Sequence, residues 1–407
     1  MDFAPRCPRY QSLDLWRGVA CLAVVIYHST FRVVRHMSDA PASVADWVVE
    51  VTRHLWIGVP MFFVISGYCI AATADSQRRK PGAIRSYAIR RLRRIYPPFW
   101  FALAGTMAFW AICHFAGAGE LVRGIGDVEG WPRAWGEWLG NLSLTESWLR
   151  RVERRPAAYI LDPAWTLCYE EQFYAVVGLA MFVAPRRFFS AMIAVTAFVL
   201  GMMIVSRVIG VPMTGFYFDG YWLLFAAGVG VYWALNYGRR GEQRALAALL
   251  LAMVVGSALW STPFTHHGRA GSLGPDHMLI GSLFALLLLA LRRWDGRIAE
   301  SKLAKPLMLC GVMCYSLYLT HWPVVNLVSR WLDGAGHRTS EAACLVILPA
   351  CVLTALAAGG GFYWLVERRF LNRPGTSPPP VEAAEPDIDS PLPEGRWAGV
   401  LASEAKG

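Results

Sequence analysis

The first long apolar run of the chain contains an acid, an arginine and a histidine whose spacing suits chemistry. Asp14, Arg17 and His28 lie within LDLWRGVACLAVVIYH. Arg17 and His28 are eleven positions apart. In an α-helix this is three turns plus about 20°, so both side chains share one face, roughly 16 Å apart. A neutral imidazole there suits a general base or an acyl carrier. The structural alternative is a capping Asp–Arg pair and a histidine bonded to a neighbouring helix.

Two further apolar runs carry ionisable groups. Glu170 and Glu171 stand in PAWTLCYEEQFY, and at least one carboxylate must face inward. His321 stands in CYSLYLTHWPVV, where Pro323 is expected to kink the helix and free a carbonyl. The functional interpretation is that Glu170 or Glu171 orients an imidazole or binds substrate hydroxyls, and that His321 carries a proton or donates to an oxyanion. The alternatives are solvated interfacial acids and a histidine bonded to the freed carbonyl.

A basic cluster precedes the third long apolar run. Within RSYAIRRLRRIYPPFW, four arginines fall in five positions: Arg90, Arg91, Arg93 and Arg94. Helical spacing pairs each of the first two with at least one of the last two. Arginine forks bind phosphates bidentately, so the cluster predicts a site for a ligand with several phosphates. A signal that sets membrane topology is a second interpretation, and the two are compatible.

These groups stand in a chain of 407 residues that is 55% hydrophobic and only 17% charged. Soluble domains average about 25% charged residues, so an ordinary soluble enzyme, a disordered chain and a disulfide-stapled domain are excluded. The net charge of +10 does not indicate nucleic acid, because the basic residues cluster in short loops between apolar runs. The nine cysteines show no metal-ligand spacing, and His266, His267 and His277 read as solvated, so no metal is expected.

The elements that position these residues are predicted to be membrane-spanning helices. We expect an all-α, polytopic transmembrane bundle of about ten spans, each near 20 residues. Of the 39 Lys and Arg residues, 26 fall on the side that holds both termini, which the positive-inside rule makes cytoplasmic. Residues 1–12 form a cytoplasmic segment, 13–370 the membrane domain and 371–407 a disordered cytoplasmic tail. The expected spans are 13–34, 55–73, 97–116, 164–184, 187–206, 218–236, 244–261, 278–291, 306–330 and 340–364. The Ser66–Gly67 pair of the second span is expected to permit close helix packing, with a polar Ser66 lining a cavity. The cysteines mostly lie inside apolar runs and are expected to be small buried hydrophobes.

The ordered motifs resemble those of the acyltransferase-3 family of integral membrane acyltransferases. The resemblance runs from about residue 10 to 370 and rests on LDLWRGVACLAVVIYH, VPMFFVISGYCIA, RSYAIRRLRRIYPPFW, PAWTLCYEEQFY and CYSLYLTHWP. The family pattern in the first helix is a basic residue, ten intervening residues and a histidine, and Arg17 and His28 match it. Its Arg-x-x-Arg pattern fits two registers, Arg90 with Arg93 and Arg91 with Arg94. Its Trp-Ser-Leu-x-x-Glu segment matches Trp165 to Glu170, with Thr166 in place of Ser. No SGNH-type domain, which some members carry, is recognised.

The resemblance implies transfer of an acyl group, commonly acetyl, from cytoplasmic acyl-coenzyme A to a hydroxyl of an envelope or secreted glycan. Acyl-CoA would be a donor substrate, with no permanently bound cofactor, and Arg17 and the arginine cluster would hold its phosphates. His28, Glu170 and His321 would form the catalytic group. The transfer would proceed either in a ternary complex or through an acyl-His intermediate. The implied location is a bacterial inner membrane. The alternative is a transporter or flippase of a lipid-linked sugar or other small molecule, which would also bury ionisable groups.

Overall fold

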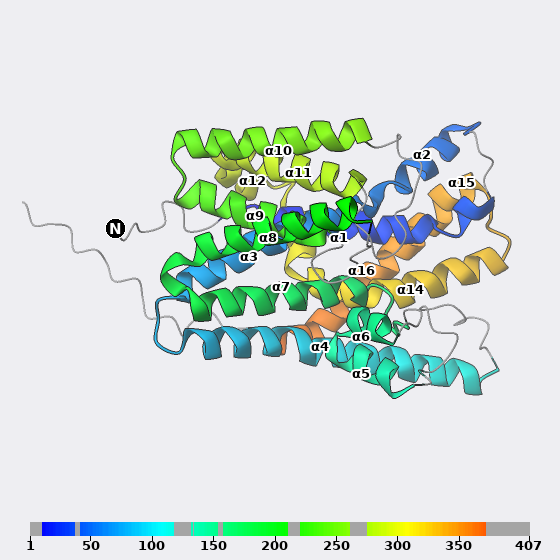
Figure 1. The fold of residues 1–407 in the computed structure, drawn as a ribbon. Coiled ribbons are helices and arrows are strands. Elements are labelled where there is room, and N and C mark those ends of the chain that lie inside the picture. The colour runs from blue at the N-terminus through cyan, green and yellow to red at the C-terminus, as the bar shows by residue number, and fades with distance from the viewer. Residues whose placement is uncertain are drawn as a thin grey trace, which may run out of the picture. The chain divides into compact units, whose positions relative to one another are not determined.

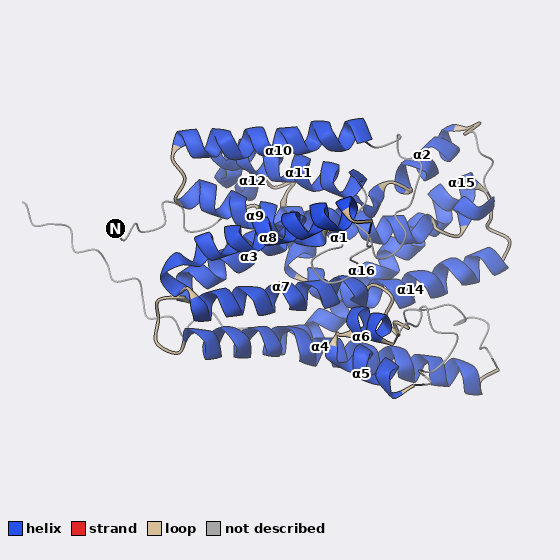
Figure 2. Ribbon diagram, viewed as in Figure 1, coloured by secondary structure: helices blue, strands red, loops and turns tan. Residues whose placement is uncertain are grey.

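The computed structural model describes residues 10–36, 41–117, 132, 134–153, 158–210, 220–260 and 275–371, which form helices and turns without a strand (Figures 1 and 2). The expected all-α class is therefore confirmed. The segment before Tyr10 and the tail after Leu371 lie outside the described residues. The helices are α1 (Leu13–Thr30), α2 (Val44–Thr52), α3 (Gly58–Gln77), α4 (Ala83–Phe115), α5 (Trp135–Ser143), α6 (Glu146–Val152), α7 (Ala164–Val183), α8 (Phe188–Val208), α9 (Tyr221–Asn236), α10 (Arg240–Trp260), α11 (Pro275–Leu291), α12 (Asp295–Glu300), α13 (Lys305–Val312), α14 (Cys314–Gly334), α15 (Ser340–Ala342) and α16 (Leu348–Leu365).

Each of the ten predicted ranges coincides with one or more of these helices. Among the described residues, six helical stretches are long and apolar enough to cross a membrane, or seven if the bent pair α13–α14 is one span. α9 is apolar but short, and α1 and α7 are not among the six. Both carry the ionisable side chains singled out above, which lower their mean hydropathy. The structure thus supports a polytopic helical membrane protein, with six or seven spans by length and composition.

At the centre of the bundle, glycines let the main chains of α3 and α9 pack directly against each other. A Cβ atom at Gly67 of α3 would clash with the carbonyl oxygen of Phe225, and one at Gly228 of α9 would clash with that of Val64. Small residues let membrane helices approach this closely, as expected for the Ser66–Gly67 pair. Around this contact pack the fully buried side chains of Phe63, Phe173, Trp222 and Phe225. The close approach fixes α3, one wall of the cavity described below.

The N-terminal end of α1 is tied to two neighbouring elements. Its Gly18 faces Leu307 of α13 so closely that a Cβ atom would meet the carbonyl oxygen of Leu307. Asp295, which is fully buried, accepts hydrogen bonds from the backbone N–H groups of Gln11 (2.7 Å) and Ser12 (2.8 Å). A carboxylate at a helix N-terminus satisfies donors that the helix itself leaves free. The start of α1 is therefore held in position.

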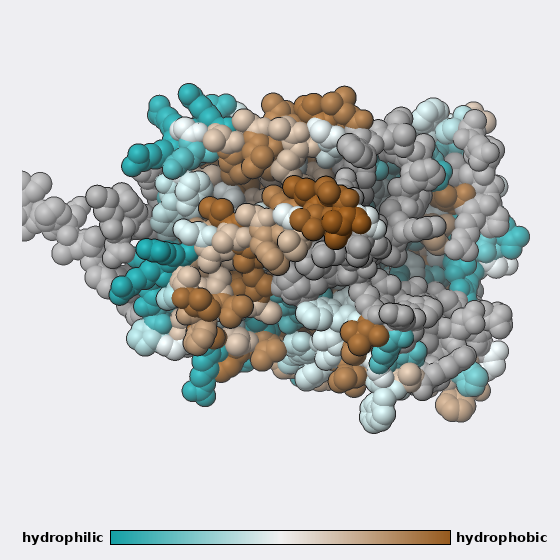
Figure 3. Space-filling model, viewed as in Figure 1, coloured by the Kyte–Doolittle hydropathy of each residue, from teal (hydrophilic) through white to brown (hydrophobic). Residues whose placement is uncertain are grey.

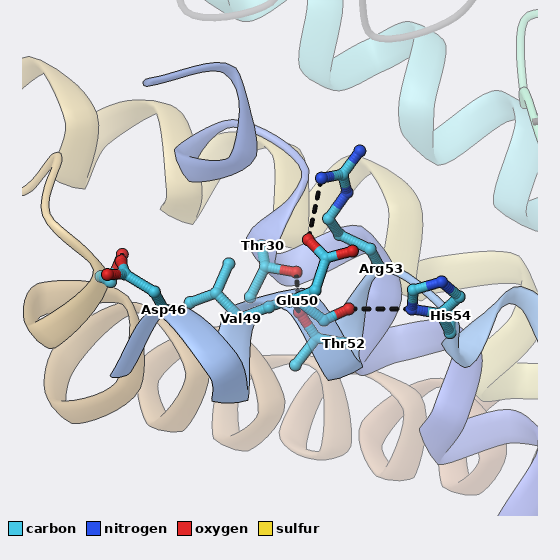
Figure 4. Close-up of polar contacts among 8 residues, drawn as sticks. Thr30, Asp46, Val49, Glu50, Thr52, Arg53 and His54 are labelled. Atoms are coloured by element: carbon cyan, nitrogen blue, oxygen red, sulfur yellow. Dashed lines mark hydrogen bonds and ion pairs between the residues drawn. The ribbon is translucent and has the colours of Figure 1, made fainter. Parts of the chain in front are cut away.

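The opposite end of α1 is held by α2 (Figure 4). The Thr30 and Thr52 hydroxyls lie 2.6 Å apart, and Arg53 pairs with Glu50 at 2.8 Å. His54 Nδ1 lies 3.0 Å from the carbonyl oxygen of Glu50. The contact between Thr30 and Thr52 joins the last turn of α1, which contains His28, to a helix outside the ten expected spans.

The sharpest break in the bundle separates α13 from α14. The two helices meet at 81° around Met313, whereas α14 runs from Cys314 to Gly334 through Pro323. The expected bend at Pro323 is therefore not where the helix breaks. Past the bend, the buried Glu367 carboxylate caps α14, because it accepts hydrogen bonds from the Ser316 N–H (3.0 Å) and hydroxyl. A neighbouring element thus fixes the direction in which α14 projects.

The exposed surface of the bundle is apolar where helices face outward. Figure 3 shows brown residues gathered over α8 and α10, with teal residues near the start of α10. A single face of soluble protein rarely exposes so much contiguous apolar surface, and lipid is the environment that suits it. The exposed side chains there are Ile193, Phe198, Leu200, Ile204, Val205, Leu249, Leu251, Val255 and Leu259.

Candidate active site

A cavity of about 380 Å³ lies among α1, α3, α4, α7 and α14. It is the place where the ionisable residues of separate helices converge. Its lining includes six of the singled-out side chains: Arg17, His28, Arg91, Arg94, Glu170 and His321. The arrangement of these helices can be followed in Figure 1. Residues more than 300 positions apart in the sequence therefore line one cavity.

Arginines gather at one end of the cavity. Arg17 Nη1 pairs with Asp14 at 2.6 Å, and Arg17 Nη2 donates to Cys69 Sγ at 2.9 Å. Arg91 Nη2 reaches Thr73 Oγ1 at 3.4 Å, and its guanidinium lies 4.8 Å from the centre of the Tyr174 ring. Arg94 lines the same region. This end is strongly electropositive and presents planar donors to anything that enters.

The other two arginines of the cluster point elsewhere. α4 is one helix from Ala83 to Phe115, so the whole cluster is helical. Arg90 is exposed and donates to Ser86 Oγ, with Nη2 at 2.6 Å. Arg93 is exposed and donates to the carbonyl oxygen of Arg369 at 3.5 Å. Of the two registers that the sequence left open, the one that lines the cavity is Arg91 with Arg94.

One of the two adjacent glutamates enters the cavity. Glu170 accepts a hydrogen bond from the Tyr174 hydroxyl at 2.8 Å, and the Tyr174 and Ser66 hydroxyls lie 3.2 Å apart. All three residues line the cavity, which agrees with a polar role for Ser66. Glu171 does not line it, although one of its oxygens, Oε1, is buried without a hydrogen-bond partner among the described residues. The solvated interfacial pair is therefore not what the structure shows.

The two singled-out histidines meet at the opposite end. The ring centres of His28 and His321 lie 5.4 Å apart, and the Trp322 ring stands edge-on to His28 at 4.5 Å. His321 Nδ1 contacts the carbonyl oxygens of Leu317 (3.0 Å) and Tyr318 (2.8 Å). Pro323, which has no N–H, frees the carbonyl four residues before it, that of Leu319. The carbonyl contact expected for His321 is present, but the acceptors are different ones.

Tyrosines of α14 and cysteines complete the lining. The Tyr318 hydroxyl lies 2.9 Å from Thr166 Oγ1 and also donates to the carbonyl oxygen of Pro163. Tyr315 donates to the carbonyl oxygen of Ile95 at 2.9 Å. Sequence reasoning missed both tyrosines. The available signal was the repeat of three in Tyr315, Tyr318 and His321, which places them on one helical face. Cysteines interpreted only as buried hydrophobes also line the cavity: Cys21, Cys69 and Cys314.

The loop histidines behave differently from the expectation. His277 is not solvated: its ring packs against Trp56 (4.7 Å between centres) and Tyr221 (6.0 Å), and its Nδ1 is buried. His266 and His267 lie outside the described residues. Within the described ranges, no group of three His, Cys, Asp or Glu side chains could hold a metal ion. The site is thus built from arginines, imidazoles, hydroxyls, thiols and the carboxyl groups of Asp14, Asp162 and Glu170.

Residues 10–360 match the family described as acyltransferase domain, Acyl_transf_3. Acyltransferase MdmB of Streptomyces mycarofaciens is 26% identical over 95% of this chain and 97% of its own length. The putative membrane-bound transacylase BcsY of Komagataeibacter xylinus is 25% identical over 93% of this chain and 86% of its own. O-acetyltransferase OatA of Staphylococcus aureus is 24% identical over 90% of this chain but only 57% of its own length. No solved structure matches the chain significantly.

Proposed function

Since the chain belongs to the acyltransferase-3 family, we propose that it transfers an acyl group, acetyl in the first instance, from acyl-CoA to a hydroxyl of an envelope or secreted glycan. The choice of acetyl and of an oxygen acceptor is supported by the name of the Staphylococcus relative. The observation that carries the proposal is the convergence of arginines, Glu170 and two imidazoles on one cavity. Its volume of about 380 Å³ falls within the about 300–1,000 Å³ of small-molecule sites.

The proposed membrane arrangement has ten spans with both termini in the cytoplasm. It counts α1 and α7 as spans despite their polar residues, because those residues face the cavity rather than lipid. Polar groups inside a bundle are tolerated where they line such a space. The arrangement puts the arginine end at the cytoplasmic side, where acyl-CoA is, and the imidazole end in the outer half.

In the proposed donor site, Arg17, Arg91 and Arg94 bind the phosphates of CoA. A guanidinium fork matches the paired oxygens of a phosphate, and the three arginines suit a ligand that carries a pyrophosphate and a further phosphate. Asp14 and Thr73 hold two of these guanidinium groups in place. The pantetheine arm then follows the Arg17–His28 face of α1, which brings the thioester to the imidazoles.

At the proposed reaction centre, His28 accepts the proton of the acceptor hydroxyl while its oxygen attacks the thioester carbonyl. The C–S bond breaks, and the proton passes to the CoA thiolate. In a second route, the imidazole attacks first and carries the acyl group to the acceptor. Both routes use the same geometry. Glu170 accepts from Tyr174, whose ring Arg91 contacts, and it orients groups through Tyr174 and Ser66.

The test replaces His28 with alanine. We expect His28→Ala to abolish transfer of labelled acetyl from acetyl-CoA to membrane or glycan material, while the protein still inserts and accumulates. His114→Ala is the matched control, because this exposed histidine near the end of α4 lies outside the cavity. Full transfer by His28→Ala would falsify the proposed role. Glycan mass spectra of a deletion strain complemented with each variant identify the acyl group and its recipient. Movement of a lipid-linked sugar without any acylation would favour the transporter.

A further inference from the structure

Two buried ring nitrogens at the imidazole end have no hydrogen-bond partner among the described residues. They are Nδ1 of His28 and Nε2 of His321. A buried polar atom without a partner costs free energy, so such atoms are uncommon and call for an explanation. Here the rings that carry them are neighbours, with centres 5.4 Å apart. The two nitrogens are not bonded to one another in this structure, but they belong to adjacent rings.

The main chain decides which nitrogen of His321 carries the proton. Its Nδ1 faces the carbonyl oxygens of Leu317 and Tyr318, and a carbonyl oxygen only accepts hydrogen bonds. Nδ1 is therefore the protonated nitrogen. In a neutral imidazole the other nitrogen is then a bare acceptor. His321 Nε2 consequently cannot donate to an oxyanion, which removes one of the roles considered for this residue.

We propose that His321 is a positioning residue that fixes the tautomer of His28: a turn of the His28 ring lets its Nδ1–H donate to Nε2 of His321, which leaves Nε2 of His28 bare and reactive. The proposal rests on the proposed function and gives the two histidines different roles: His28 reacts, and His321 sets its tautomer. A hydrogen bond at one ring nitrogen sets the protonation of the other, and it stabilises the imidazolium that forms during proton transfer. In this chain the acceptor is His321, whose own tautomer is set by its hydrogen bonds to main-chain carbonyl oxygens.

The proton then follows a balanced path. His28 Nε2 takes the proton of the acceptor hydroxyl as the new C–O ester bond forms. The resulting imidazolium keeps its Nδ1–H bonded to His321 Nε2. When the C–S bond of the thioester breaks, Nε2 of His28 returns the proton to the CoA thiolate. The products are the acyl ester and CoA thiol, and His321 ends in its starting protonation state.

A competing partner for His28 Nδ1 stands nearby. The Trp322 indole Nε1 is also buried without a partner among the described residues, and its ring is edge-on to His28. If this N–H donated to Nδ1, then Nε2 of His28 would carry the proton. The two pairings predict opposite tautomers of His28, so an experiment distinguishes them.

The first test compares two amides at position 321. Gln places an acceptor oxygen near the position of Nε2, whereas Asn places its N–H near Nδ1 and no acceptor beyond it. We expect His321→Gln to keep kcat within about tenfold and His321→Asn to lower it by about 100-fold or more, with the KM for acetyl-CoA within about twofold in both. Equal kcat values in the two variants, or a rise in donor KM that accounts for the loss, overturns the proposal.

The second test reads the tautomer in the wild-type chain and uses a variant only to assign the His28 signal. Nitrogen NMR of histidine-labelled protein reports which ring nitrogen is protonated, and the His28 signal is the one absent from His28→Ala. We expect a protonated Nδ1 and a bare Nε2 at His28. A protonated Nε2 overturns the proposal in favour of the Trp322 pairing. If His28→Ala is inactive but His321→Asn keeps full kcat, the proposed function stands and only this inference fails.

Discussion

Within five consecutive residues of α4, arginines that look alike in the sequence have different environments. Arg91 and Arg94 are three positions apart, so they share the helical face that borders the cavity. Arg90 and Arg93 share the neighbouring face, where both are exposed. A rotation of about 100° per residue is enough to separate the two pairs. The phosphate contacts proposed above therefore belong to one pair only.

We expect the double substitution Arg91→Ala, Arg94→Ala to raise the KM for acetyl-CoA by tenfold or more, because each charged hydrogen bond contributes about 1.5–3 kcal/mol. The matched control is Arg90→Ala, Arg93→Ala, which removes the same charge from the exposed face and should leave the donor KM within about twofold. The measurement is a donor titration of transfer in membranes. Equal effects of the two double variants would show that charge alone, and not a phosphate site, is responsible.

The sequence could identify a residue of the cavity where its type is out of place in an apolar helix. Arg17, His28 and His321 stand out for this reason, and all three line the cavity. Cys69 could not be identified, because thiol groups are common in buried helices, and Tyr318 was marked only by its three-residue spacing from His321. Nor could Glu170 be separated from Glu171, since adjacent residues differ only by one step of helical rotation. Which of the two glutamates faces the cavity can be decided only when the positions of the neighbouring helices are known.

At the scale of the helices, the approach of α3 to α9 depends on residues without a side chain. We expect Gly228→Ala to lower stability by about 1–3 kcal/mol, since its Cβ would meet the carbonyl oxygen of Val64 and the two helices would have to separate. Gly201→Ala in α8 is the control, because nothing lies within 4 Å of a Cβ there.

The measurement is thermal unfolding in detergent, followed by size-exclusion of the surviving folded protein. A melting temperature of Gly228→Ala no lower than that of Gly201→Ala would show that the contact does not limit packing. Gly67 on the facing helix was expected to permit close packing, whereas Gly228 was not singled out. Which glycines matter depends on the partner helix, and this cannot be read from one segment of sequence.

The helices themselves were largely predictable, because long apolar runs have few other uses. Two departures have physical causes. α4 starts at Ala83, well before its apolar part, because the arginine cluster is itself helical. The expected single span at 306–330 is two helices at 81°, and the bend lies at Met313 rather than at Pro323. Tertiary contacts such as the Glu367 cap on α14 set that angle, and hydropathy carries no information about them.

At the scale of the whole molecule, the number of spans determines which side each end of the cavity faces. If α1, α7 and the short α9 all span, together with the seven stretches counted above, the count is ten and both termini are cytoplasmic. We expect a fluorescent protein fused after residue 371 to fluoresce and alkaline phosphatase fused there to be inactive. Phosphatase fused after α4, at residue 117, should be active, because that fusion point lies outside.

The matched comparison places both reporters at each of the two points, since each reporter matures on only one side of the membrane. Active phosphatase at residue 371 would mean that an odd number of helices span. The arginine end and the imidazole end would then have to be assigned to the two sides again. The reactions tested at the residue scale do not depend on this outcome, so the two sets of experiments are independent.

Arg17 and His28 stand on the same rigid rod, α1, which is tied at both ends. Their separation is therefore fixed at about three helical turns. The distance between the phosphates and the thioester carbonyl carbon of the donor has to match it. One extra residue between the two would lengthen the separation by only 1.5 Å but would swing His28 through about 100°, away from the cavity. Chain length between these positions is thus more tightly constrained than the identity of the residues that fill it.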